Sequence, residues 1–180
     1  MRGFGLIELM ITISLLGILT SLAVDNFGTW IQDTKTRSVA ESLQNGIRLA
    51  QTEAIKQSRT TTFNLVGRSW NIQVMLRGGN STNPDTSIGT SGVIHNGDIP
   101  DANLVNITET LTTTPTAQIR FNSIGRLVSP TNTVNYLITN PRGIRRMQVS
   151  VNMAGKIRMC DPDKTLSASN PDGVDADGNC

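Results

Sequence analysis

Aromatic side chains and histidine are scarce in this sequence. Its 180 residues include four Phe, two Trp and one Tyr, and His95 is the single histidine. No cysteine or pair of carboxylates lies near His95, so we interpret it as a solvated loop residue. The sequence also lacks Cys-x-x-Cys, a nucleophile elbow and a phosphate-binding Gly-Lys-Ser/Thr motif. We therefore expect no enzyme, no cofactor and no metal, and a core built from Ile, Val, Leu and Met.

Acidic residues are absent between Leu111 and Cys160, whereas five Asp and one Lys follow from Asp161 to Cys180. This segregation predicts a basic face beside an acidic tail. Without aromatic partners for base stacking, the basic run favours phosphate contacts over sequence reading. Its basic residues are Arg120, Arg126, Arg142, Arg145, Arg146, Lys156 and Arg158.

A long apolar run follows the N-terminus, with Glu8 as the single charge in residues 4–24. A helix of this length covers roughly the ~30 Å hydrocarbon core of a bilayer. Arg2 precedes the run and no Ala-x-Ala-like cleavage site follows it. The positive-inside rule predicts a single pass, with the basic end in the cytoplasm and the remaining chain outside.

The start of the run, Gly3-Phe4 followed by Leu6-Ile7-Glu8-Leu9-Met10, resembles the class III signal of type IV pilins and type II secretion pseudopilins. The resemblance implies that prepilin peptidase cuts between Gly3 and Phe4 and methylates Phe4. It further implies anchoring in the bacterial inner membrane with a periplasmic head, followed by entry into a filament. Gly5 and Asp25 stand where many pilins carry Thr and Pro.

Glu8 is a carboxylate one turn into a membrane helix. A central carboxylate costs about 2.5–3.5 kcal/mol to insert, and such residues usually have a partner. The α-amino group released by cleavage, with a pKa near ~8, is largely cationic at neutral pH and would pair with Glu8 of a neighbouring subunit. The alternative is a carboxylate that snorkels to the interface. We interpret Glu8 as an assembly residue.

Residues 25–57 continue the helical pattern, now amphipathic. Val39, Leu43, Ile47, Ala50 and Ala54 recur at spacings that place them on one helical face. An isolated membrane anchor joined to a separate domain is one interpretation. A continuous helical spine packed on a sheet is favoured, because no Pro or Gly/Ser linker separates the two halves.

Beyond residue 58 the patterns are those of strands. Gly67-Arg68, Pro141-Arg142-Gly143 and Met153-Ala154-Gly155 predict turns, and the Gly-, Asn-, Ser- and Thr-rich stretch from Gly78 to Asp98 predicts a long surface loop. The expected strands are Thr61–Val66, Trp70–Leu76, Leu104–Ile107, Ala117–Asn122, Thr133–Thr139, Ile144–Val151 and Lys156–Met159.

The segment from Ile47 to Lys56 and the ending Gly-Lys-x-Arg-Met-Cys are similar to the GspH/FimT/FimU branch of minor pilins and pseudopilins. The resemblance implies an α+β fold, with a long N-terminal helix packed on a small antiparallel β-sheet domain. It also implies a structural subunit that helps to initiate or cap a type IV pilus or type II secretion pseudopilus, with other pilins or pseudopilins as partners. The resulting division is 1–3 leader, 4–24 transmembrane half-helix, 25–57 amphipathic half-helix and 58–180 head.

A FimT-like role in DNA uptake for natural transformation is the alternative. In that type a C-terminal Gly-Arg-x-Arg motif binds DNA, and Gly155-Lys156-Ile157-Arg158 resembles it with Lys in place of the first Arg. Arg142, Arg145 and Arg146 would extend the patch onto double-stranded DNA. The competing interpretation is a basic face that meets another subunit or solvent.

Cys160 and Cys180 are the two cysteines. Outside the cytoplasm we expect them to form a disulfide that pins the acidic tail, rather than two buried thiols. Asp172, Asp175 and Asp177 lie inside this loop, without the Asp-x-Asp-x-Asp-Gly order of a calcium loop. A solvated acidic loop is favoured over a calcium site.

Overall fold

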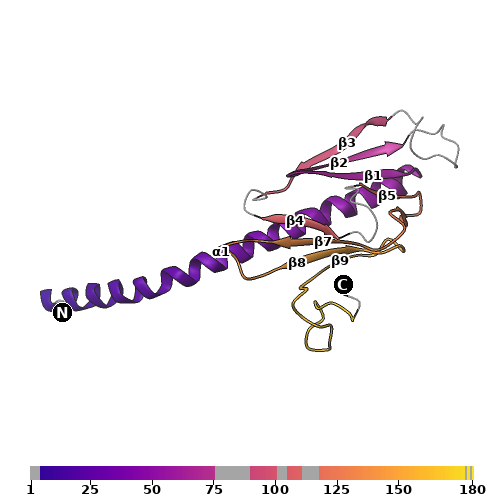
Figure 1. Ribbon diagram of the computed structural model, residues 1–180. Coiled ribbons are helices and arrows are strands. Elements are labelled where there is room, and N and C mark those ends of the chain that lie inside the picture. Colours follow the sequence, from indigo (N-terminus) through magenta and orange to yellow (C-terminus); the bar gives the residue numbers. More distant parts are fainter. Residues whose placement is uncertain (1–4, 76–89, 101–104, 111–117, 177, 179) are drawn as a thin grey trace.

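One helix, α1, runs without a break from Leu6 to Gln57 in the computed structural model (Figure 1). The structure describes residues 5–75, 90–100, 105–110, 118–176, 178 and 180. The N-terminal part of α1 projects from a β-rich head, and its C-terminal part lies against that head. The helix ends where Ser58 takes a left-handed conformation, with φ of 51°. The continuous helix confirms the predicted spine.

The predicted apolar stripe of α1 forms the centre of the core. Val39, Leu43, Ile47, Ala50 and Ala54 are all fully buried. Burying each Val, Leu or Ile side chain contributes roughly 1.5–3 kcal/mol. Strands of both sheets contact this face of the helix, so the stripe holds the two sheets together.

The first sheet has the strand order β3-β2-β1-β5-β6, with antiparallel neighbours throughout. Its central strand directly follows the helix, and Gly67, with φ of +59°, turns the chain into the next strand. The bounds are β1 Thr61–Val66, β2 Ser69–Met75, β3 Thr90–Asp98, β5 Gln118–Phe121 and β6 Leu127–Ser129.

The second sheet has the order β4-β7-β8-β9 and is also antiparallel. In β7 buried and half-buried residues alternate, whereas all five residues of β8 are buried. One face of β8 meets the helix side, and the C-terminal loop covers the other, where Gln148 donates to the Gly178 carbonyl at 2.8 Å. The bounds are β4 Asn106–Thr110, β7 Val134–Thr139, β8 Met147–Val151 and β9 Ile157–Cys160. The predicted α+β class is therefore confirmed, with two sheets.

Four features of the strand prediction were wrong. The strand expected from Ile144 begins at Met147, because the backbone N–H groups of Ile144 and Arg145 bond to Asp33 Oδ1. The loop expected from Gly78 to Asp98 contains strand β3 over Thr90–Asp98, while residues 76–89 lie outside the described part of the chain. This strand is polar because it is an edge strand, bonded on one side to β2 with two register shifts. Strand β4 begins at Asn106 rather than Leu104, and Leu104 is outside the described residues. The three-residue strand β6 was missed.

Candidate functional site: the projecting helix and the charged C-terminal face

The projecting part of α1 carries an unusual density of exposed apolar side chains. Every Leu, Ile and Met from Leu6 to Leu19 keeps more than half of its surface exposed, and Phe27 and Trp30 do the same. In water this surface would be strongly unfavourable, at roughly 1.5–3 kcal/mol for each large side chain. The helix therefore requires a non-aqueous environment or other apolar helices around it.

The helix enters the head at Gln32 and Asp33, where it is clamped to the β7–β8 connection. Asp33 Oδ1 accepts the backbone N–H groups of Ile144 and Arg145, both at 2.9 Å. The Asn140 amide donates to the Gln32 backbone carbonyl at 3.3 Å and to its side-chain oxygen at 3.0 Å. These bonds fix where the free part of the helix begins.

Glu8 lies in the first turn of α1, and its surface is exposed. The N-terminal part of α1, which carries this turn, projects from the head (Figure 1). Gly3 and Phe4, the predicted processing residues, lie outside the described part of the chain. The cleavage, methylation and pairing assignments remain predictions.

The predicted basic residues do not form one patch. Arg142, Arg145 and Arg146 lie between β7 and β8, at the end of the sheet near Asp33, whereas Lys156 and Arg158 lie at and beyond the opposite end of β8. The five residues of β8 span about 16 Å at ~3.3 Å per residue. A single ligand would therefore have to extend along the strand to contact both groups.

The acidic C-terminal loop pairs with two of the three arginines in the first of these groups. The Arg146 guanidinium forms a double hydrogen bond with the Asp163 carboxylate, with Nε to Oδ2 at 3.0 Å. This bond lowers the pKa of Asp163. Arg145 Nε lies 3.9 Å from Asp161 Oδ2, and Lys164 Nζ lies 3.3 Å from the same oxygen. Charges segregated along the sequence are thus paired in the fold.

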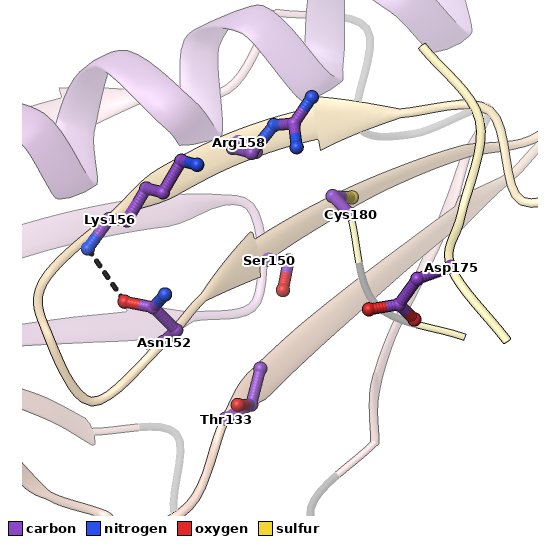
Figure 2. A pocket seen from close by; sticks show the side chains of 7 residues that line it. All are labelled: Thr133, Ser150, Asn152, Lys156, Arg158, Asp175 and Cys180. Carbon is purple, nitrogen blue, oxygen red and sulfur yellow. Dashed lines mark hydrogen bonds between the residues drawn. The ribbon is translucent and has the colours of Figure 1, made fainter. Parts of the chain in front are cut away.

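The second group lines a cavity of about 200 Å³ beneath the C-terminal loop (Figure 2). Figure 2 shows Lys156 at the end of the β8–β9 turn and Arg158 on strand β9, with Asp175 and Cys180 of the loop across the cavity. Lys156 is exposed, while Arg158 is half-buried and donates to the Pro171 carbonyl at 3.4 Å. The cavity combines two cations with a carboxylate, so its charge is partly balanced within the chain.

The predicted disulfide between Cys160 and Cys180 is confirmed, with 5.5 Å between the two Cα atoms. It joins the end of β9 to the end of the acidic loop, and Asp161 donates its backbone N–H to the Asp172 carbonyl at 2.7 Å. Among the described residues no group of His, Cys, Asp or Glu is arranged to hold a metal ion. Asp177, one of the three aspartates considered for calcium, lies outside those residues.

A polar cluster at the end of α1 corrects the interpretation of His95. His95 lies on β3, and its Nε2 atom is 3.5 Å from Oε1 of the buried Glu53. Gln57 donates to Glu53 Oε2 at 2.8 Å and Lys56 to Oε1 at 3.2 Å. The hydrogen bond from Gln57, followed by Lys56 and His95, lowers the pKa of Glu53 although burial opposes this. Because Glu53 and His95 are far apart in the sequence, the sequence alone does not predict this contact.

A β-rich head continuous with a projecting apolar helix defines a pilin-like filament subunit. The chain belongs to the GspH family: the model of the type II transport protein GspH matches residues 39–155. The prokaryotic N-terminal methylation motif matches residues 1–24. No curated protein matches the sequence.

Solved structures of similar proteins include a crystal structure of the Pseudomonas aeruginosa type IV minor pilin FimU. It shares 20% identity over 70% of this chain and 88% of that chain, with a TM-score of 0.54. The minor pseudopilin EpsH of the Vibrio cholerae type 2 secretion system shares 13% identity over 72% of this chain and 99% of that chain, with a TM-score of 0.48. The likeness to FimU shows the shared fold.

Membership of this family makes the chain a structural subunit of a type IV pilus or type II secretion system, and not an enzyme. It implies processing by prepilin peptidase, anchoring in the inner membrane and assembly with other pilins. Within the described residues, no helix meets the combined length and hydropathy needed to cross a bilayer.

Proposed function

We propose that this chain is a minor pilin or pseudopilin that helps to initiate or cap a type IV pilus or a type II secretion pseudopilus. The exposed apolar half of α1 carries the proposal, because it is joined without a break to the head. Residues 4–24 would sit in the inner membrane and then move into a filament core of similar helices. Apolar neighbours replace lipid in that core, so the transfer costs little net free energy.

In this proposal cleavage after Gly3 releases the α-amino group of Phe4, which then pairs with Glu8 of an adjacent subunit. The pairing neutralises a carboxylate one turn into the helix, where insertion costs somewhat less than the ~2.5–3.5 kcal/mol of a central position. It also sets the axial position of each helix, because only one stagger brings the two groups together.

Incorporation of variants into sheared filaments tests the proposal. Gly3→Val should leave the precursor uncut in the membrane, and Glu8→Ala should be cut normally but be depleted from filaments. Glu41→Ala is the matched control, because it removes a carboxylate from the same helix where Arg37 pairs with it at the surface of the head. Met1 on filament-associated protein, or wild-type incorporation of Glu8→Ala, would contradict this mechanism.

Binding of DNA during natural transformation is the second candidate function. This candidate is favoured by the exposed Lys156 and by Arg158, two residues further on, on the edge strand β9. The ion pairs of Arg145 and Arg146 with the acidic loop favour the structural role. Deletion of the gene separates the two. Loss of pili would support the structural role in a type IV pilus, and loss of secretion would support it in a type II secretion pseudopilus. Normal filaments with lost transformation would support DNA uptake.

A further inference from the structure

Two hairpin turns in the head have the same design. Residues 122–126 read Asn-Ser-Ile-Gly-Arg and residues 152–156 read Asn-Met-Ala-Gly-Lys. In each, the Asn side-chain oxygen accepts the backbone N–H of the closing basic residue at 2.9 Å, as Figure 2 shows for Asn152 and Lys156. In each, the Gly N–H donates to the Asn carbonyl at 2.9 Å. The pattern turns β5 into β6 and β8 into β9, in different sheets.

Gln51 of α1 joins the tips of these two hairpins. Its side-chain amide donates to the carbonyls of Gly125 and Gly155, both at 2.7 Å. The glycines have φ of +77° and +82°, and a Cβ added to Gly155 would lie 2.0 Å from the Gly125 oxygen. The tips therefore touch each other over the last turns of the helix, at the end of the head opposite the projecting half (Figure 1).

The joined tips present an apolar centre to solvent. Ile124 is 68% exposed, Met153 is 54% exposed and Ile55 of the helix end is 52% exposed. Ile55 packs at the base of the first tip, where its Cδ1 atom lies 2.8 Å from the position of a Cβ on Gly125. Because these side chains stay exposed, they add little to the stability of the isolated head.

Cations surround this centre. The segments 55–59, 122–126 and 152–156 contain Lys56, Arg59, Arg126 and Lys156 and no carboxylate. The buried Glu53 bonds to Lys56, and Asp175 lines a cavity with Lys156, so the rim keeps a net positive charge. All four cationic residues are exposed. An apolar centre with a charged rim is the usual composition of a protein docking surface, and a rim of one sign selects a partner of the opposite sign.

We propose that the paired hairpin tips dock a protein partner whose contact face is apolar at its centre and acidic around it. A membrane is disfavoured, because the tips lie about 75 Å along α1 from its N-terminal end, at ~1.5 Å per residue. Nucleic acid is disfavoured, because phosphates would contact the rim and leave the three apolar side chains unburied. The site goes beyond helix-core assembly and leaves the projecting helix available for the filament.

Photo-cross-linking in the full-length chain, expressed in its own cells, tests the proposal. The probe is p-benzoylphenylalanine at position 124, with the same probe at the exposed Val66 of the opposite β1–β2 hairpin as the control. We expect one discrete protein adduct from position 124 alone, attached at an apolar residue flanked by Asp and Glu. The double substitution Arg126→Glu, Lys156→Glu should lower its yield about tenfold, because like charges then face each other. Arg68→Glu, at the control hairpin, should leave the yield unchanged.

Four results would overturn the proposal: no adduct, an adduct between two copies of this chain, a nuclease-sensitive adduct, or an adduct whose yield survives the double substitution. The thermal unfolding of each purified variant must match the wild type, since all the substituted side chains are exposed. A variant with wild-type unfolding and lost cross-linking then reports on docking and not on folding.

Discussion

Replacing Gln51 with Ala should weaken the attachment of both sheets to the helix at once. The substitution removes two donated hydrogen bonds of 2.7 Å and leaves the carbonyls of Gly125 and Gly155 facing each other without the amide between them. Each hydrogen bond contributes a net ~0.5–1.5 kcal/mol, and a carbonyl left without a donor in a half-buried site costs more. We expect the free energy of unfolding to fall by about 2–3 kcal/mol.

Urea unfolding of residues 28–180, which comprise the head and the part of α1 packed on it, measures this loss by circular dichroism. For a domain of this size the midpoint temperature should also fall by about 4–10 °C. Thr52→Ala is the matched control, because Thr52 is exposed and its hydroxyl donates within its own helix to the Arg48 carbonyl. Gln51→Met keeps the length of the side chain without its donors, so it should lose nearly as much stability as Gln51→Ala.

A loss below ~0.5 kcal/mol for Gln51→Ala would refute this reasoning, since that is the range of ordinary surface substitutions. Full stability in Gln51→Met would show that the volume of the side chain matters and its hydrogen bonds do not.

Three further results are expected. Cys180→Ser opens a loop of 20 residues and should lower the free energy of unfolding by about 3 kcal/mol, while circular dichroism still shows both sheets. If both cysteines of the denatured, unreduced wild type can be alkylated, the disulfide is contradicted. The pKa of Glu53 in the folded protein lies below its ordinary 4.5, so the ionised Glu53 carboxylate contributes its full stabilisation above pH 4.5 and loses it as the pH falls through the pKa of the folded state. Glu53→Gln should therefore flatten this part of the acid unfolding curve. An unchanged curve would count against the polar cluster. If the head binds DNA, Lys156→Ala with Arg158→Ala should reduce the slope of log affinity against log salt by about two units, and no mobility shift at low salt would reject binding.

The helix and most turns were predictable because each depends on local pattern. The apolar stripe through Leu43 and Ile47 repeats with the helical period, and Gly67 and Gly155 mark turns that require positive φ. Strand β3 was not predictable from alternation, because an edge strand with polar residues on both faces has the composition of a loop.

The charge pairing in the candidate site depends on the path of the chain rather than on its sequence pattern. The acidic loop was expected beside the basic run, but its contacts with Arg145 and Arg146 follow from the β8–β9 register, which pairs Gln148 with Cys160 and so brings Asp161 and Asp163 to the start of β8. The contact of Glu53 with His95 likewise needs β3 to be in place. The Asn-x-x-Gly-basic pattern occurs three times, at residues 64–68, 122–126 and 152–156, so it marks hairpin turns without distinguishing the two tips that touch. Nothing in the sequence indicates that Gln51 joins those two.

Besides the buried apolar stripe, polar contacts at Asp33 and at Gln51 hold the head to its helix, and these two residues are 18 residues or about 27 Å apart along α1. A filament under tension pulls on its core helices, while drag or a bound load pulls on the heads. With fastenings at both ends, that force acts as shear along the packed helix face, and the bonds at both sites must yield together. A head attached at one end alone would peel away one bond at a time. The spacing of these two polar contacts therefore suits the subunit to bear mechanical load.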